Sequence, residues 1–189
     1  MHGYAEDRQA ALTHAFEVAR IAVAIDDRDA DAHFALGRIL YLRRMHEASL
    51  SEFDAAVTVN PSLAHAHLGY GTALGYLGRW ESAIESLDRA LRLSPHDPAI
   101  WVFSAARALW LMGSGRIEDA AESATHATRQ PTAEVTAYIV LAAALAHLGR
   151  APAKLAQFER YIRHLQAYLS GDHVPVSYTH LTLPTSDLV

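Results

Sequence analysis

Two consecutive segments of this chain, residues 30–63 and 64–97, repeat each other at an offset of 34 residues. They share nine identical positions, which are the pairs Ala30/Ala64, Ala32/Ala66, His33/His67, Gly37/Gly71, Leu40/Leu74, Glu47/Glu81, Asp54/Asp88, Ala56/Ala90 and Pro61/Pro95. A period of this length is typical of repeat proteins, in which each unit packs mainly on its neighbours in sequence. The repeat therefore favours a serial stack over a fold organised around one central core.

The pattern within each unit predicts two amphipathic helices. Apolar residues recur at helical spacing on both sides of a break near Arg44 or Gly78, and the units close at Asn60–Pro61 and Ser94–Pro95. We expect a first helix of about 14 residues and a second of about 13. Neither helix can bury its apolar stripe alone, so the stacking of successive pairs is the physical reason for the period.

The composition agrees with packed helices and excludes several kinds of site. The chain has 36 Ala among 189 residues, and 15 of its 16 basic residues are Arg. Alanine has the highest helix propensity, and this Ala and Arg bias is associated with GC-rich bacterial genomes. The absence of Cys excludes disulfides, a thiol nucleophile and Cys-ligated metals. A net charge of −5 with scattered basic residues argues against nucleic-acid binding.

Nothing in the hydropathy pattern indicates a membrane protein. The longest uncharged stretch of the helical part, residues 135–149, is 15 residues long, whereas a bilayer-spanning helix needs about 20. The first residues lack the basic and apolar regions of a signal peptide. We therefore expect a buried helix at 135–149, a cytoplasmic protein and no membrane partner.

The repeat continues with a change of spacing. The break at Gly78 recurs at Gly115, 37 residues on, and again at Gly149, whereas Trp101 still lies 34 residues after His67. We therefore expect three additional residues within 108–115, where they would lengthen the turn between two helices.

The region before the first full unit predicts an incomplete one. Ala15, Ala19 and Ala22 fall where the second helix of a preceding unit would lie, and only about ten residues precede that helix. Apolar residues cover much of its circumference, whereas a terminal cap needs a polar outer face. We therefore expect residues 1–29 to be a partial unit in a fragment of a larger protein that supplies the covering helix.

These units resemble the tetratricopeptide repeat family over about residues 8–168. The matching positions are small residues at Gly37, Gly71 and Ala105, bulky residues at Phe53 and Leu87, small residues at Ala56, Ala90 and Ala127, and the terminal prolines. Two departures are Ser49, where later units have Ala, and Pro152 near the start of the last helix, a place where proline is tolerated. The resemblance implies an all-α, right-handed superhelical solenoid of antiparallel helix pairs, with units at 30–63, 64–97, 98–133 and 134–170.

The last 19 residues differ from the rest of the chain. Residues 171–189 contain no Ala, Arg, Lys or Glu. Residues 177–185 also resemble a translated sequencing adapter seen at the ends of metagenomic reading frames. We expect an unstructured, non-native tail without function; a natural tail or a short strand is the alternative, because β-branched residues are frequent there.

Motifs for catalysis, metals or nucleotides are weak. His65 and His67 are two residues apart, whereas metal ligands on a helix are spaced by three or four. The segment starting at His46 resembles the beginning of a zinc-protease motif but lacks the second histidine, and no Ser, His and acid set has local support. The glycines of residues 69–75 lie inside a predicted helix, where close packing explains them better than a dinucleotide fingerprint. We expect no enzyme activity, metal, cofactor or small-molecule substrate.

The surface of the stack is the remaining candidate site. The resemblance implies that successive first helices line a concave groove, and that the residues facing it are Phe34, Arg38, Tyr41, Leu68, Thr72, Tyr76, Val102, Ala106, Trp110, Ile139, Ala143 and His147. Aromatic residues often anchor interfaces, so we expect a peptide or partner domain to bind there. The alternative for Tyr76 and Trp110 is packing between adjacent helices. Binding of a C-terminal carboxylate by Lys and Asn, as some relatives do, is not expected because this set lacks both.

A second functional hypothesis places the chain in a signalling protein. Residues 68–79 and 93–98 are similar to repeat tracts that follow class III nucleotide cyclase or winged-helix regulator domains. In that case the chain is the C-terminal regulatory segment of a bacterial protein whose catalytic or DNA-binding domain lies upstream of Met1.

Overall fold

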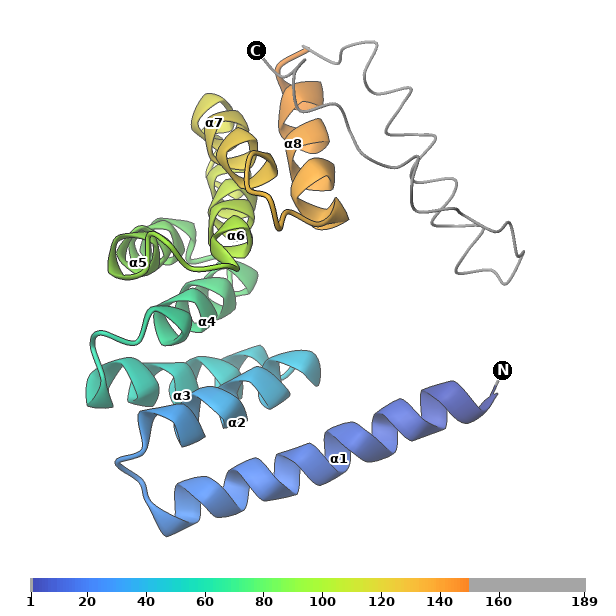
Figure 1. Cartoon of the computed structure of the whole chain (residues 1–189), viewed down its shortest axis with the longest axis vertical. Coiled ribbons are helices and arrows are strands. Elements are labelled where there is room, and N and C mark those ends of the chain that lie inside the picture. The colour runs from blue at the N-terminus through green and yellow to red at the C-terminus, as the bar shows by residue number, and fades with distance from the viewer. Residues whose placement is uncertain (1, 150–189) are drawn as a thin grey trace.

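The computed structural model describes residues 2–149, with side chains from residue 10 onward, and this part of the chain forms eight α-helices and no strand (Figure 1). The helices are α1 (His2–Ile25), α2 (Ala30–Leu42), α3 (His46–Val59), α4 (Ala64–Tyr76), α5 (Trp80–Leu93), α6 (Ile100–Gly113), α7 (Ile117–Thr128) and α8 (Val135–His147). The expected second helix of the last unit, within 150–170, and the expected tail, 171–189, lie outside the described residues.

The helices pack in serial order, and each contacts the next along the chain (Figure 1). In addition α2, α4, α6 and α8 contact one another in series, whereas α3, α5 and α7 do not. This asymmetry places α2, α4, α6 and α8 on the inside of the curved stack. We call these four the inner helices and α3, α5 and α7 the outer helices.

The turn between the two helices of each pair has the same geometry throughout. Arg44, Gly78, Gly115 and Gly149 all have a positive φ, between 62° and 81°. In the first three turns the next residue's backbone N–H donates to the carbonyl five positions back, as in Arg79 to Leu74 at 3.0 Å. This bond caps the carbonyl end of the helix. The breaks expected from the sequence are therefore confirmed as left-handed helix ends.

The structure corrects the expected position of the three additional residues. The turn at 114–116 has three residues, as the turn at 77–79 does. The extra length lies earlier: the loop before α6 has six residues (94–99) where the loop before α4 has four (60–63), and α6 has 14 residues where α4 has 13. Residues of α6 therefore correspond to those 37 positions earlier in α4.

Small residues let the helices approach closely around a few large side chains. Phe53 is 2% exposed, and a Cβ added to Gly37 would lie 2.8 Å from its ring. Leu87, one repeat later, is fully buried, and a Cβ on Gly71 would come within 3.0 Å of it. The serine that departs from the repeat, Ser49, is buried and donates from Oγ to the Gly37 carbonyl at 3.0 Å. The hydroxyl is thereby satisfied inside the core.

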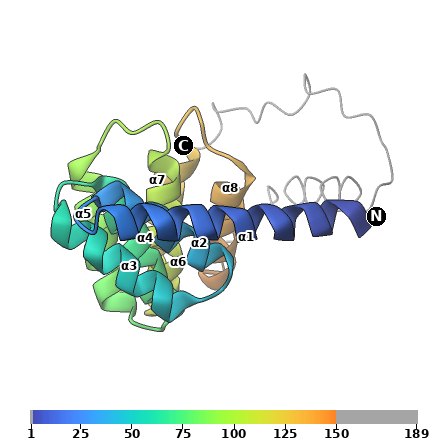
Figure 2. The same ribbon diagram turned by 90° about the horizontal axis from the view of Figure 1, so that it is seen from below.

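Helix α1 is longer than the others, and its N-terminal half projects beyond the stack (Figure 2). Phe16, Ala19 and Val23 pack against α2 and α3. On a different face, Val18, Ile21 and Ile25 are 53%, 51% and 81% exposed. The helix therefore has one packed apolar face and one open one among the described side chains.

Candidate interaction surface

All 12 residues expected in the groove lie on the inner helices, three on each, and none is fully buried. The sets are Phe34, Arg38 and Tyr41 on α2, Leu68, Thr72 and Tyr76 on α4, Val102, Ala106 and Trp110 on α6, and Ile139, Ala143 and His147 on α8. We call the solvent-facing side of the inner helices the inner surface.

An aromatic cluster joins three helix pairs at the end of the inner surface where α2 and α4 finish. It consists of Tyr41, His46, Tyr76 and Trp110. The Tyr76 ring stacks on His46 with centroids 4.8 Å apart and meets Trp110 edge-on at 5.1 Å. The Tyr41 hydroxyl donates to that of Tyr76 at 3.4 Å. Burial, and then this hydrogen bond, raise the pKa of Tyr41 above its ordinary value, so the Tyr41 hydroxyl stays protonated at neutral pH.

Within the cluster the residues differ in how open they are. Trp110 is half-buried and its ring lies against Gly75, while Tyr76 is 52% exposed. The indole Nε1 of Trp110 and Nδ1 of His46 are buried and have no hydrogen-bond partner among the described residues. Trp110 therefore acts as packing between α4 and α6, as the alternative interpretation held, and Tyr76 is the member that a ligand can contact.

A second aromatic group lies near the beginnings of the inner helices. The His65 ring is 6.1 Å from that of Phe34 and 5.3 Å from that of Phe103, edge-on to both. The Arg38 guanidinium carbon lies 5.7 Å from the Phe34 ring centroid. Phe34 and Arg38 were expected on this surface from the sequence, whereas His65 was not.

The middle of the surface is partly different from expectation. Leu68 and Val102 pack against the buried residues Ala64, Ala90 and Phe103, so much of their area is used between helices. Leu109 is 37% exposed and lies 37 residues after Thr72. It therefore occupies the place that the 34-residue register assigned to Ala106. With the extra residues placed before α6, the sequence itself would have identified Leu109.

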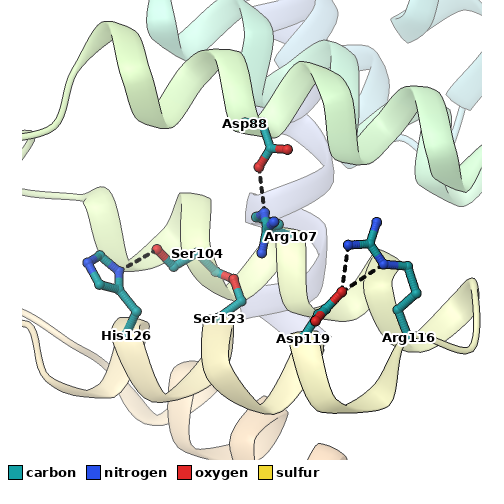
Figure 3. Close-up of polar contacts among 7 residues, drawn as sticks. All are labelled: Asp88, Ser104, Arg107, Arg116, Asp119, Ser123 and His126. Carbon is teal, nitrogen blue, oxygen red and sulfur yellow. Dashed lines mark hydrogen bonds and ion pairs between the residues drawn. The ribbon is translucent and has the colours of Figure 1, made fainter.

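Outside the inner surface, polar side chains tie neighbouring helices together (Figure 3). Arg107 of α6 donates from Nε to Asp88 of α5 at 2.6 Å, and Ser123 of α7 donates to the Ser104 carbonyl at 2.9 Å. The Ser104 hydroxyl lies 2.9 Å from His126 Nδ1. Ser104 is only 1% exposed, so its hydroxyl is not accessible as a nucleophile and this pair holds α6 against α7.

Neither a metal centre nor a membrane span emerges from the part of the chain that the structure describes. No three His, Asp or Glu side chains in it are grouped closely enough to hold an ion. None of its helices combines the length and the apolar character that crossing a bilayer requires.

Comparison with known proteins agrees with the helix-pair architecture. Residues 64–107 match the model of the tetratricopeptide repeat family. The crystal structure of MamA is similar with a TM-score of 0.67 at 14% identity, over 87% of this chain and 95% of that one. TTC0263, a thermophilic tetratricopeptide repeat protein of Thermus thermophilus, is similar with a TM-score of 0.62 at 25% identity, over 74% and 75%.

A third similar structure is YrrB, described as a tetratricopeptide repeat protein with an unusual peptide-binding site, with a TM-score of 0.61 at 18% identity over 88% of this chain and 87% of that one. No curated protein sequence matches the chain. The helices, their serial packing and these similarities show that the fold is an all-α solenoid of the tetratricopeptide repeat type.

Proposed function

We propose that this chain is a non-enzymatic protein-interaction scaffold that binds an extended peptide, or an extended segment of a partner domain, on its inner surface. The observation that carries the proposal is a row of exposed apolar side chains on successive inner helices. Tyr76 on α4, Leu109 on α6 and Ile139 on α8 are 52%, 37% and 40% exposed. Apolar patches that cross several elements mark interaction sites, and aromatic anchors supply much of the binding energy there.

The comparisons support this function by analogy. YrrB, a solenoid of the same fold, is described as having a peptide-binding site. An analogy of fold alone is a weak argument for function, so the proposal depends on the inner surface of this chain. The burial of the Ser104 hydroxyl beside His126 favours a scaffold over an enzyme.

The proposal is tested by selecting peptides and locating where they bind. A phage-displayed library of random 12-residue peptides is selected against the full chain, and recovered peptides are synthesised with a fluorophore for anisotropy titration. We expect Tyr76→Ala and Leu109→Ala each to weaken binding about tenfold, since a central anchor contributes about 1–2 kcal/mol. Circular dichroism melting verifies that each variant is folded.

The matched control is Leu93→Ala. Leu93 is 38% exposed, close to the 37% of Leu109, but it lies at the end of outer helix α5. The same substitution there should leave the affinity unchanged. Peptides that lose binding with Leu93→Ala but not with Leu109→Ala would contradict the proposal.

A second candidate is a regulatory segment of a bacterial cytoplasmic signalling protein, with a cyclase or winged-helix domain upstream. The open apolar face of α1, formed by Val18, Ile21 and Ile25, favours it, because such a face is stabilised when a further helix covers it. Reading the genomic DNA upstream of the Met1 codon tests it. An open frame that encodes another domain supports this candidate, and a stop codon with a ribosome-binding site contradicts it.

A further inference from the structure

Charged residues are segregated between the two sides of the stack. The outer helices α3, α5 and α7 carry nine acidic residues and two basic ones, a net charge of −7. The inner helices carry one acidic residue, Asp31, and two basic ones, Arg38 and Arg107, a net charge of +1. The negative charge of the stacked helix pairs therefore belongs to the outer side.

Arg38 is the basic residue of the inner surface that a ligand can reach. Arg107 is already paired with Asp88, with 2.6 Å between Nε and Oδ1. Arg38 is exposed and has no ion pair among the described residues. Asp31 lies seven residues before Arg38 on the same helix, which separates them by about 10 Å along the axis, too far for a direct pair. The guanidinium of Arg38 is thus an unpaired cation beside Phe34 in an apolar surface.

We infer that the inner surface binds an apolar peptide segment that contains an internal Asp or Glu, whose side-chain carboxylate pairs with Arg38. The inference rests on the proposed function and names the chemistry of its ligand. The net charge of −5 taken alone would favour a basic partner. The inner surface favours an acidic one, because it is a helix diameter of about 10 Å away from the outer carboxylates, and salt screens charges over about 8 Å.

A side-chain carboxylate fits this surface better than a chain terminus. A planar guanidinium accepts one carboxylate in a two-pronged pair. A terminus also brings backbone groups that need donors close by, and the inner helices contain no Asn, Gln or Lys to supply them. An internal acidic residue instead leaves apolar neighbours on either side to contact residues such as Tyr76 and Leu109.

The experiment uses the full chain and peptides from the 12-residue library, displayed so that their C-termini are joined to the coat protein. Recovered peptides are synthesised with an acetylated N-terminus, an internal fluorophore and an amidated C-terminus. We expect an Asp or Glu among apolar residues, and a five- to tenfold loss of affinity when that residue becomes Asn or Gln. Arg38→Gln should produce the same loss and should abolish the effect of the peptide change, because the two substitutions remove one interaction.

Two further arms make the inference sharper. Selection against Arg38→Glu should recover peptides with Lys or Arg in place of the acidic residue. Arg92→Gln, an exposed arginine on outer helix α5, is the matched control and should leave the affinity unchanged. Raising the salt concentration to about 0.5 M should weaken binding to the wild type but not to Arg38→Gln.

The outcomes separate the inference from the proposed function. Peptides that depend on Tyr76 and Leu109 but bind Arg38→Gln unchanged overturn the carboxylate pairing and leave the scaffold function standing. Peptides that bind only with a free C-terminus also overturn it. If no recovered peptide depends on Tyr76 or Leu109, the proposed function is wrong and the inference falls with it.

Discussion

The indole ring of Trp110 on α6 lies directly against the backbone of Gly75 on α4, so that a Cβ added to Gly75 would come within 2.6 Å of Nε1 and closer still to the ring carbons. Only glycine leaves room for the indole at this place. The contact brings α4 and α6 together on the inner surface and sets the position of Trp110 against Tyr76. The aromatic cluster therefore depends on a residue with no side chain.

Gly75→Ala should destabilise the chain by about 1–3 kcal/mol and displace the indole. Alanine gains about 1 kcal/mol of helix propensity over glycine, but the forced movement of a packed ring costs more. Urea unfolding followed by circular dichroism measures the free energy of unfolding, and a change in tryptophan emission reports the displaced ring.

The control for this prediction is the same substitution in a Trp110→Ala background. With the indole removed the clash disappears, so Gly75→Ala should then be neutral or stabilising by up to about 1 kcal/mol. Equal destabilisation in both backgrounds would mean that the indole is not the cause.

His33 and His67 occupy the same position of consecutive units but have opposite pKa shifts. Each ring bonds through Nε2 to the carbonyl six residues back, at 3.1 and 3.0 Å. Burial, the largest single effect, acts to lower the pKa of His33, but the 2.7 Å hydrogen bond to Glu52, the bond to the Asp27 carbonyl and the charges of both acids raise it above 6.5. At His67 burial, aided by the charge of Arg89, outweighs the bond to the Pro61 carbonyl and lowers the pKa below 6.5.

The difference follows from the residue 19 positions later, which is Glu52 in one unit and Ser86 in the next. Glu52→Ser should lower the pKa of His33, and Ser86→Glu should raise that of His67. Chemical shifts of the imidazole carbon-bound protons, followed by NMR across pH 4–9, measure both. An unchanged His33 titration in Glu52→Ser would contradict this explanation.

The same shifts predict how stability depends on pH. Because the pKa of His33 is raised in the folded state, its stabilisation is fully present below pH 6.5 and is lost as pH rises through the folded-state pKa. His67 acts in the opposite direction: its lowered pKa gives stabilisation above pH 6.5 that is lost as pH falls through the folded-state pKa. Glu52→Ser should therefore reduce the stability of the chain more at pH 5.5 than at pH 8, which urea unfolding at the two pH values measures.

The pair of Asp88 and Arg107 should contribute measurably to the contact between α5 and α6. Its side chains are 35% and 23% exposed, so solvent screens the pair only in part. A double-mutant cycle with Asp88→Asn and Arg107→Gln should give a coupling energy of about 1 kcal/mol that falls with added salt. The nearby pair of Arg116 and Asp119 is the control (Figure 3). Both are on α7 or its cap and about half exposed, and we expect about 0.3–0.5 kcal/mol from them. Equal coupling in the two pairs would contradict the assigned role of burial.

The helix pairs were predictable because the self-similarity of the sequence reports a repeated packing requirement. Gly37 and Gly71, and Phe53 and Leu87, are at matched positions because the same small-to-large contact recurs in each unit. The three added residues were misplaced because a comparison of sequences registers only the total spacing between Gly78 and Gly115. Loop and helix residues count equally in that spacing, so the extension of the loop before α6 was attributed to the turn after it.

The candidate surface was predictable only in outline. The helical period placed residues such as Tyr41 and Tyr76 on one side of their helices. It gave no reason to include His46 and His65, because their contacts are with aromatic rings from other helices. It also could not decide whether Trp110 is open or packed.

The sequence by itself determined which residues form helices, where the helices end and that neighbouring pairs bury each other's apolar sides, since periodicity, glycine and proline act locally. Only the tertiary structure decided that Trp110 fills the space over Gly75 and that Leu109 takes the place beside Thr72. It also showed that the acidic residues lie on the outer helices while Arg38 stays unpaired on the inner ones. These features depend on the register between helices from different units, which is fixed by packing across the stack and leaves no local signal in the chain.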